Sequence, residues 1–454
     1  MPAIHTYADA LGAIWDRSGY DRGFISNPFA GDDAARLGLR RTEAILERSG
    51  NPHRRYRIVH VAGSKGKGST TTMIDAILRA AAVRTGRYVS PHLHSYRERI
   101  VVDDEPISET DFALLTQRAI AATEDVEHTH PELGEVTAWE LTTAMALLWY
   151  AETGCAWAVI EVGLGGTLDA TNIVTPEVSV ITRLDYEHTA ILGDTIEEIA
   201  ANKAGIIKPG KPVVSANQLP AAMNVIAARA HDLGCQLLIE DRDFSATGSD
   251  SNFTFHDATG TIADLASSLI GRHQVENAGL AIEAARLAIA PADEAIRAGL
   301  AQVVNPGRFE VVSLPNGATV VIDGAHTPVA ADALRVALGD RFPGQRAQVV
   351  IGMLQGKDAN HLLANIAPVV SAWHLAPLET PRTMRVDDLA TDLGTPTVPV
   401  FRHPSVAGAL ASVTSQSAGA LIVVTGSLST ASEARVALGI ATNDPAPTSA
   451  PRVS

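Results

Sequence analysis

The chain has 454 residues, more than one compact core usually accommodates, so we expect two or three domains. Hydrophobic residues make up 46% of it and charged residues 19%, which is an ordinary globular composition. The formal net charge of -15 argues against a general nucleic-acid or membrane-surface binder, because no excess of Lys and Arg is available to neutralise phosphates. A small anionic substrate remains compatible, provided that local cations or a metal ion offset its charge.

The N-terminal segment MPAIHTYADALGAIW lacks the basic start and apolar block of a secretory signal. No apolar run reaches the ~18 residues that a membrane span requires. Cys155 and Cys235 both lie beside apolar runs, so two buried free thiols in a reducing compartment are favoured over a disulfide. We therefore expect a cytoplasmic protein that binds neither nucleic acid nor membrane.

In the first half of the chain, short apolar runs alternate with helical patterns. Strands are predicted at 55–63, 85–90, 155–163 and 177–184, and helices at 70–82 and 140–152. Such strands, apolar almost throughout and separated by helices, are typical of a parallel sheet covered on both faces.

Near residue 300 the pattern is interrupted by QVVNPGRFEVV, in which Asn305, Pro306 and Gly307 form a turn or linker signal. Beyond it, strands are predicted at 318–326, 346–354, 371–378 and 420–428, with helical stretches such as 329–339 between them. This pattern predicts a second, smaller α/β domain. The tail ATNDPAPTSAPRVS is rich in Pro, Ser, Thr and Ala, and we expect it to be disordered.

The loop HVAGSKGKGST joins a predicted strand to a predicted helix. It departs from the strict phosphate-loop pattern GxxxxGK[ST], because Val61 stands where the first glycine belongs and Gly68 follows Lys67. Its backbone N–H groups and the helix N-terminus can nevertheless bind an anion, with Lys67 reaching the outer phosphates and Ser69 or Thr70 supplying a hydroxyl. A flexible turn with exposed lysines is the alternative, and the strand–loop–helix setting favours the phosphate site.

Several polar residues follow predicted strands, where ligands gather in open α/β sheets. Glu161 ends a buried strand, so its carboxylate should meet a cation, either a ligand or a neighbouring Arg or Lys. Asp185, Glu187 and His188 follow the next strand and could ligate a divalent ion, although a lone histidine in a turn is more often a hydrogen-bonding residue.

Two further positions are ambiguous from local pattern. Lys203 lies on a helix whose expected N-cap is Thr195, and a helical lysine usually belongs to a solvated face. In VVIDGAHTP, Asp323 and His326 follow a strand of the second domain, where the carboxylate could face a ribose or simply cap a turn.

Ten stretches of the chain can be compared with known families, namely LGLRRTEAILERSGNPH, HVAGSKGKGST, YVSPHLHSYRERI, AWELTTAMAL, IEVGLGGTLDATN, ITRLDYEHTAILGDTIEEIAANKAGIIKPG, NPGRFEVV, IDGAHTP, GMLQGKD and VVTGSLS. Taken together and in this order, they resemble the folylpolyglutamate synthase/dihydrofolate synthase family of Mur-type ligases. The resemblance runs from about residue 35 to about residue 436. It implies an α/β fold with a mostly parallel sheet: a P-loop ATPase domain over 1–304 and a smaller Rossmann-like glutamate-ligase domain over 305–440. Residues 441–454 are the tail that the composition predicts to be disordered.

The resemblance also implies the site residues. The family's loop reads roughly GTNGKGS, so both departures from the strict pattern are expected in this family. The residues implied to bind ATP are Gly63, Gly66, Lys67, Gly68, Ser69, Asn277, Arg308 and Asp323. Those implied to bind Mg²⁺ are Ser90, Glu161 and His188, so the magnesium hydroxyl comes from Ser90 rather than from the loop. Trp139, Asp169 and His326 are implied to contact substrate, and Lys203 matches a lysine that the family carries as a carbamate (N6-carboxylysine).

The activity implied is ATP-dependent addition of L-glutamate to folates through an acyl phosphate, in a monomer, with Lys67, His188 and Lys203 as catalytic residues. The segment LGLRR favours additional use of 7,8-dihydropteroate. Thr167, Glu187 and Thr327 depart from the family's usual Arg, Asp and Asn. A peptidoglycan-type Mur ligase and an ATPase that is not a ligase are the alternatives.

Overall fold

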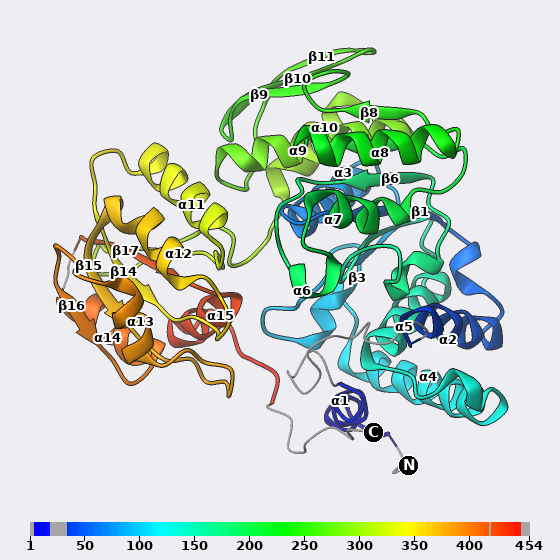
Figure 1. Ribbon diagram of the computed structural model, residues 1–454, viewed down its shortest axis with the longest axis horizontal. Coiled ribbons are helices and arrows are strands. Elements are labelled where there is room, and N and C mark those ends of the chain that lie inside the picture. Colours follow the sequence, from blue (N-terminus) through cyan, green and yellow to red (C-terminus); the bar gives the residue numbers. More distant parts are fainter. Residues whose placement is uncertain (1–3, 19–33, 417–418, 446–454) are drawn as a thin grey trace.

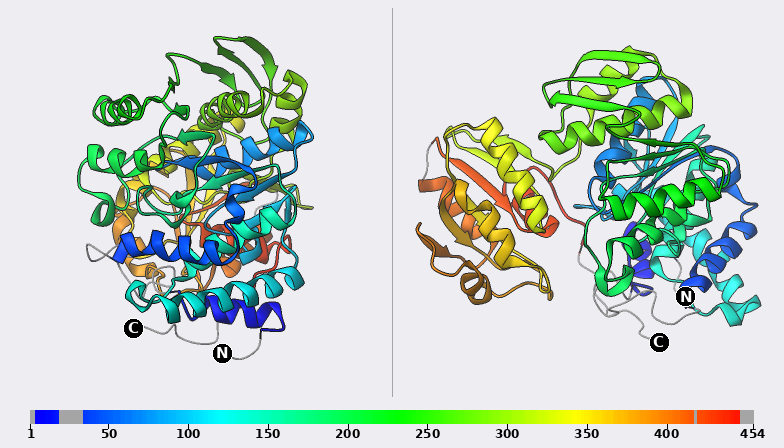
Figure 2. Two further views of the ribbon diagram at one scale, coloured as in Figure 1. Left: turned by 90° about the vertical axis from the view of Figure 1, so that its right-hand side faces the viewer. Right: turned by 45° about the horizontal axis from the view of Figure 1, so that its top comes forward.

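Residues 4–18, 34–416 and 419–445 are described by a computed structural model of the chain. Two α/β parts follow one another along the sequence and lie side by side, each with its own sheet (Figures 1 and 2).

The sheet of the first part has eight strands in the order β4-β3-β2-β5-β1-β6-β7-β8. Its strands are β1 (Arg57–Ala62), β2 (Thr85–Tyr88), β3 (Ile100–Val102), β4 (Glu105–Pro106), β5 (Trp157–Glu161), β6 (Val178–Ile181), β7 (Val213–Ser215) and β8 (Leu237–Ile239). Neighbours from β2 to β8 pair in parallel, and β3 and β4 add an antiparallel edge. Parallel strands are buried on both faces, which explains why β2, β5 and β6 are buried throughout.

Helices cover both faces of this sheet (Figure 1). One face packs against α1 (Tyr7–Trp15), α2 (Ala34–Arg48), α4 (Glu109–Thr129) and α5 (Ala138–Glu152), and the other against α3 (Lys67–Ala80), α9 (Arg272–Ile289) and α10 (Asp293–Gln302). Alternate residues of β1 enter these two cores, since Ile58 belongs to the first and Val59 and Val61 to the second. Beside β6 and β7 lie α7 (Ile196–Lys203) and α8 (Pro220–Asp232), which enclose a smaller core.

The remaining elements of this part are short. A three-stranded antiparallel sheet of β9 (Ser245–Ser249), β10 (Asn252–Asp257) and β11 (Gly260–Leu265) packs on α9 through apolar side chains such as Phe253 and Phe255. The other short helices are α6 (Thr189–Leu192), η1 (Pro52–Arg54), η2 (Tyr96–Arg99), η3 (Pro131–Leu133), η4 (Ala170–Ile173) and η5 (Ala204–Ile206).

The second part has a six-stranded sheet in the order β12-β13-β17-β14-β15-β16, parallel except for β12. The strands are β12 (Glu310–Ser313), β13 (Thr319–Ile322), β14 (Ala347–Ile351), β15 (Val370–Leu375), β16 (Val400–Arg402) and β17 (Leu421–Thr425). One face packs against α11 (Pro328–Arg341), α12 (Ala359–Ile366) with η6 (Ala367–Val369), and α13 (Val386–Leu393). The other packs against α14 (Val406–Gln416) and α15 (Leu428–Ala437).

The predicted α/β class with mostly parallel sheets is confirmed, and the break expected near residue 305 falls between α10 and β12. Thr195 caps α7 as predicted, and both cysteines are unpaired. In the part of the chain that the structure describes, no helix is long and apolar enough to cross a membrane.

The predicted disordered tail begins at residue 441, but its first residues hold defined contacts. Asp444 accepts hydrogen bonds of 2.6 Å from the Tyr7 hydroxyl and of 2.6 Å from the Tyr96 backbone N–H. Asp444 thus contacts the first part of the chain, whereas residues 446–454 of the predicted tail lie outside those described.

Candidate functional site

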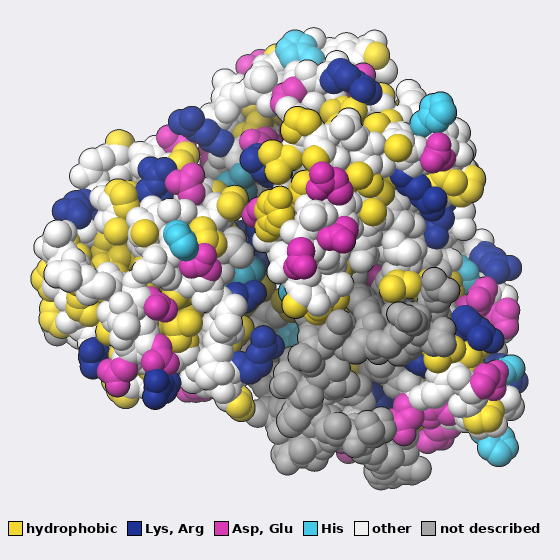
Figure 3. Space-filling view, viewed as in Figure 1, with side chains coloured by type: hydrophobic (Ala, Val, Ile, Leu, Met, Phe, Trp, Pro, Cys, Tyr) yellow, Lys and Arg dark blue, Asp and Glu magenta, His cyan; other side chains and the backbone are white. Residues whose placement is uncertain are grey.

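The carboxyl ends of β1, β5 and β6 in the first sheet, and of β13, β14 and β17 in the second, line one cleft of about 1750 Å³. Figure 3 shows the hollow between the two parts, with Lys, Arg and His side chains visible in it. Because ligands of open α/β sheets bind beyond these strand ends, this cleft is the candidate active site.

The loop from β1 to α3 forms one wall of the cleft. Gly66 caps α3 with a φ of 86°, and a Cβ at this position would lie 2.2 Å from Asn277 Oδ1. Only glycine therefore suits both this backbone conformation and the close approach of Asn277. The first N–H groups of α3 have no carbonyl partners within the helix, so the loop presents donors to an anion in the cleft.

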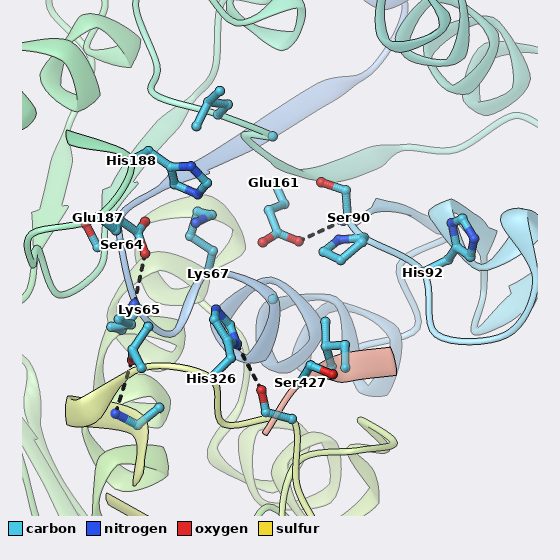
Figure 4. Close-up of a pocket in the computed structure, with 18 of the residues that line it drawn as sticks. Ser64, Lys65, Lys67, Ser90, His92, Glu161, Glu187, His188, His326 and Ser427 are labelled. Atoms are coloured by element: carbon cyan, nitrogen blue, oxygen red, sulfur yellow. Dashed lines mark hydrogen bonds and ion pairs between the residues drawn. The ribbon is translucent and has the colours of Figure 1, made fainter. Parts of the chain in front are cut away.

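Lys67 is the first residue of α3, and its ammonium donates to the carbonyl of Gly63 at 2.9 Å. Glu161 ends β5, is 4% exposed and accepts the Ser90 backbone N–H at 3.1 Å. Burial raises the pKa of Glu161 to about 7, against the opposing charge of Lys67. Figure 4 shows Lys67 between His188 and Glu161, with Ser90 beside Glu161.

Lys203 lies behind the loop rather than on a solvated face. Its side chain is 2% exposed, and its Nζ donates to the carbonyl of Gly63 at 2.7 Å. Burial and the charge of Lys67 lower the pKa of Lys203 to about 7, against the opposing charge of Glu187 at 3.7 Å. A neutral amine is therefore accessible near neutral pH.

Glu187 is held between two lysines. Its carboxylate lies 2.9 Å from Lys65 Nζ and 3.7 Å from Lys203 Nζ. Burial disfavours the ionised carboxylate, but the charges of Lys67, Lys65 and Lys203 outweigh burial and lower the pKa of Glu187 to about 2. Glu187 thus carries a permanent negative charge among the lysines of the loop.

The three predicted metal ligands face one cleft, and their donor set fits Mg²⁺. Ser90, Glu161 and His188 all line it, and together they offer a hydroxyl, a carboxylate and an imidazole. Glu161 forms no ion pair with any described residue, so a divalent cation would offset the cost of its burial. His188 adopts a left-handed backbone conformation with a φ of 51°, which turns it into the cleft at the start of α6.

The predicted substrate residues all line the cleft. The indole N–H of Trp139 donates to Asp169 Oδ2 at 3.1 Å, and burial raises the pKa of Asp169. The ring of His326 lies 2.9 Å from the carbonyl of Gly324, and burial lowers the pKa of His326 to about 4. Figure 4 shows His326 near Lys65 and Lys67.

Asp323 and Arg308 come from the second part and its linker, and both face the same cleft. Asp323 accepts the backbone N–H groups of Phe309 and Ala325, each at 2.8 Å. Burial raises the pKa of Asp323, whereas the neighbouring Arg308 opposes the shift. Asn277 reaches the cleft from α9 and donates to Gln274 Oε1 at 3.0 Å.

Of the predicted site residues, all line the cleft except Gly63, Thr70 and Lys203. The carbonyl of Gly63 accepts from Lys67 and from the buried Lys203, and Thr70 is fully buried in α3. Asp185 does not line it either. Several residues without a predicted role also line the cleft, among them Lys65, Lys357 and Ser427. The last two follow β14 and β17, so their place after apolar strands was the signal that could have found them.

The three departures from the family pattern each have a structural partner. Thr167 donates its hydroxyl to the carbonyl of Asn202 at 2.9 Å, and Glu187 pairs with Lys65 as described. Thr327 is the N-cap of α11 and accepts the backbone N–H of Ala330 at 3.3 Å. The local structure therefore accommodates all three.

Two family models match the chain: the Mur ligase middle domain over residues 61–285 and the Mur ligase glutamate ligase domain over residues 307–428. The dihydrofolate synthase/folylpolyglutamate synthase of Bacillus subtilis is 36% identical over 368 residues, which cover 78% of this chain and 84% of the relative.

Solved structures agree with this relationship. A folylpolyglutamate synthase of Mycobacterium tuberculosis complexed with ADP has a TM-score of 0.83 at 32% identity, covering 90% of this chain and 96% of that chain. Escherichia coli FolC in complex with DHPP and ADP has a TM-score of 0.79 at 32% identity, covering 88% of this chain and 92% of that chain.

The fold and the cleft are thus those of a Mur-type ligase, built from a middle domain and a glutamate ligase domain. More narrowly, the chain belongs to the folylpolyglutamate synthase/dihydrofolate synthase family of ATP-dependent ligases, as the sequence motifs had predicted.

Proposed function

We propose that this protein joins L-glutamate to folates at the expense of ATP, and to 7,8-dihydropteroate as well. The observation that carries the proposal is the single cleft in which the phosphate loop, Ser90 and Glu161 face Arg308 of the linker and Asp323 of the second part. One cleft can therefore hold a nucleotide, an acid and an amine together, as a ligase requires.

The reaction has two steps. A carboxylate oxygen of the folate attacks the γ-phosphorus of ATP, the bond to the β-phosphate oxygen breaks, and an acyl phosphate and ADP form. The amine of glutamate then attacks the acyl carbon, loses a proton, and displaces inorganic phosphate to leave an amide. Phosphorylation is needed because a carboxylate has no adequate leaving group.

The loop from Gly63 to Ser69 and the ammonium of Lys67 bind the phosphates of ATP, and Asn277, Arg308 and Asp323 hold the rest of the nucleotide across the cleft. Ser90, Glu161 and His188 would hold Mg²⁺, which neutralises phosphate charge when bound. Because these groups are fixed before the reaction, they stabilise developing charge without reorganisation.

Lys203 is proposed to carry a carbamate. Its neutral amine would attack CO₂, form an N–C bond and lose a proton, leaving an anionic oxygen in place of a cation. The burial that lowers the pKa of Lys203 to about 7 supports this step, because only the neutral amine is nucleophilic. An anion beside Lys65 and Lys67 is also electrostatically favourable there.

The pterin end of the substrate is assigned to Trp139 and Asp169, and His326 is assigned to the glutamate side of the cleft. Use of 7,8-dihydropteroate is supported by α2, from which Gly38 and Arg41 reach the cleft beside Trp139. Arg41 is fixed there by Glu140, with its Nε 2.7 Å from a carboxylate oxygen. All of these groups come from one chain, so a monomer suffices for activity.

A product assay tests the proposal. The protein is incubated with ATP, Mg²⁺ and labelled glutamate, with tetrahydrofolate in one tube and 7,8-dihydropteroate in another, and the amide product is identified by mass. A labelled product in both tubes supports both activities, and a product with tetrahydrofolate alone restricts the enzyme to folates. ATP turnover that ignores both folate and glutamate would instead identify an ATPase that is not a ligase.

A further inference from the structure

A histidine lies fully buried in the middle of the central strand β1, outside the cleft. His60 is 0% exposed and shares its strand face with Ile58, toward the core that contains α5. Its Nε2 lies 2.9 Å from the hydroxyl oxygen of Thr171, a residue of η4. An imidazole in such a place costs more than an apolar side chain unless its hydrogen bonds are made, and its Nδ1 has no hydrogen-bond partner among the described residues.

The protons of this contact can be assigned. The hydroxyl of Thr171 donates to Asp169 Oδ1 at 2.5 Å, because a carboxylate oxygen accepts, so toward His60 the same hydroxyl oxygen must accept. Nε2 of His60 therefore carries the proton. The ring is neutral, since burial lowers the pKa of His60 to about 3.

The same carboxylate reaches the cleft. Asp169 Oδ1 also accepts the Thr171 backbone N–H at 3.0 Å, while Oδ2 accepts the Leu164 N–H at 3.0 Å and the Trp139 indole N–H at 3.1 Å. His60, Thr171 and Asp169 are at most 2% exposed, so the chain of bonds is shielded from water up to the indole.

Trp139 forms part of the cleft wall, and its ring has little freedom. It stacks on Tyr88 with ring centroids 5.3 Å apart, and a Cβ on Gly163 would lie 2.4 Å from its Cζ2. With the ring stacked on Tyr88 and closely approached by Gly163, the bond to Asp169 fixes the orientation of the indole.

We propose that His60 is a positioning residue for the substrate end of the cleft, acting through Thr171 and Asp169 on the indole of Trp139. His60 orients the Thr171 hydroxyl toward Asp169, Asp169 is thereby held in one rotamer, and its second oxygen holds the indole ring. The inference rests on the proposed function in one respect, that the acid substrate binds against Trp139.

Two pairs of variants test the relay. His60→Leu and Thr171→Val remove a link, whereas His60→Gln and Thr171→Ser keep a donor or hydroxyl at the same place. We expect each loss variant to raise KM for tetrahydrofolate about tenfold, as removal of one buried hydrogen bond would. KM for ATP and kcat should stay within about twofold, and the conservative variants should recover most of the loss.

A double-mutant cycle separates the relay from a general loss of stability. In a Trp139→Phe background the ring has no N–H to donate to Asp169, so His60→Leu should no longer change KM for tetrahydrofolate. A rise as large as in the native background overturns the inference, as does an unchanged KM in both loss variants. If His60→Leu does not fold, as judged by thermal unfolding, the Thr171 pair and its own cycle decide the question.

Failure of the proposed function is recognised separately. If the unmodified protein forms no amide from tetrahydrofolate and glutamate, the function assigned above is wrong. Fluorescence of Trp139, taken as the difference between each variant and its Trp139→Phe counterpart, then still reports whether His60 controls the environment of the ring, and an unchanged difference spectrum overturns the relay.

Discussion

Glu161 shows how a single buried carboxylate links stability to pH. Its pKa is about 7 in the folded protein against an ordinary 4.5, so between these values the folded state binds a proton that the unfolded state has released. The contribution of Glu161 to the free energy of unfolding is thus fully present below pH 4.5 and is lost as the pH rises through 7. We expect Glu161→Gln to be more stable than the native protein at about pH 8, by on the order of 3 kcal/mol, and the difference to vanish toward pH 4.5. Thermal and denaturant unfolding across this range measure it.

Magnesium supplies the complementary measurement. Added Mg²⁺ should raise the unfolding temperature of the native protein at about pH 8 and leave that of Glu161→Gln unchanged, because ligand binding stabilises only the state that binds. Glu240→Gln is a matched control: burial also raises the pKa of Glu240 to about 7, but this residue does not line the cleft. It should reproduce the pH effect and keep the response to Mg²⁺. An equal response in Glu161→Gln contradicts the metal site.

Lys67 provides a test of the phosphate loop. Lys67→Met should lower kcat/KM for ATP at least about a hundredfold, because it removes a fixed positive charge where phosphate charge develops. Lys211→Met is the control, since Lys211 pairs with Glu177 away from the cleft and its loss should leave turnover unchanged. Initial rates of amide formation measure both, and a Lys67 variant within a few-fold of the native rate would argue against the assignment.

The residues differ in how far the sequence could predict them. The loop glycines and Lys67 act through local backbone geometry, so a short stretch of sequence contains the signal. Lys203 could not be placed in this way, because its burial depends on the carbonyl of Gly63, which lies 140 residues away in the chain. His60 reads as one more residue of an apolar strand until Thr171 is placed beside it.

At the scale of elements, parallel strands were the easiest to predict because they are apolar throughout. The elements that were missed are short, exposed on one side, or both. The β3–β4 edge has two exposed residues in β4, and β9 is largely exposed, so neither stands out as an apolar run. The position of β9 follows from packing of its sheet against α9 and from pairing with β10, and that of β3 and β4 from pairing with β2 and with each other. Local pattern does not contain this information.

The segment after α15 carries a prediction of its own. Asp444 receives two short hydrogen bonds from the first part of the chain, and burial together with this carboxylate raises the pKa of Tyr7. Asp444→Ala should lower the free energy of unfolding by about 1–2 kcal/mol, allowing for partial exposure of the contact. Chemical denaturation measures the change. Asp388→Ala, which removes an exposed carboxylate paired with Arg385, should have no measurable effect, and equal behaviour of the two variants would contradict a docked segment.

For the whole molecule, the proposed function depends on bringing two sheets together. The first supplies the phosphate loop and the second supplies Asp323, with Arg308 in the linker between them. Sequence could predict each sheet and the break near residue 305, because these are properties of consecutive residues. It could not predict how the sheets face each other, since that depends on contacts such as those of Asp444, whose partners are 348 and 437 residues away.

This arrangement predicts how a defective contact across the cleft should fail. An acyl phosphate reacts with water unless the cleft excludes it, so any change that leaves ATP binding intact but loosens the contact between the two parts should uncouple ATP use from amide formation. Arg308 is placed to have this effect, because its charge acts on both Asp323 of the second part and Glu161 of the first.

We therefore expect Arg308→Ala to release more ADP per amide bond than the native protein, which should use about one, with a ratio of about three or more. Both products are counted in one reaction, ADP by chromatography and the amide by incorporated label. Arg385→Ala, in the same part of the chain but outside the cleft, should keep the native ratio. A variant of Arg308 that is slower but still makes one amide per ADP would show that the arginine contributes to substrate binding alone. Exclusion of water from the cleft would then not depend on it.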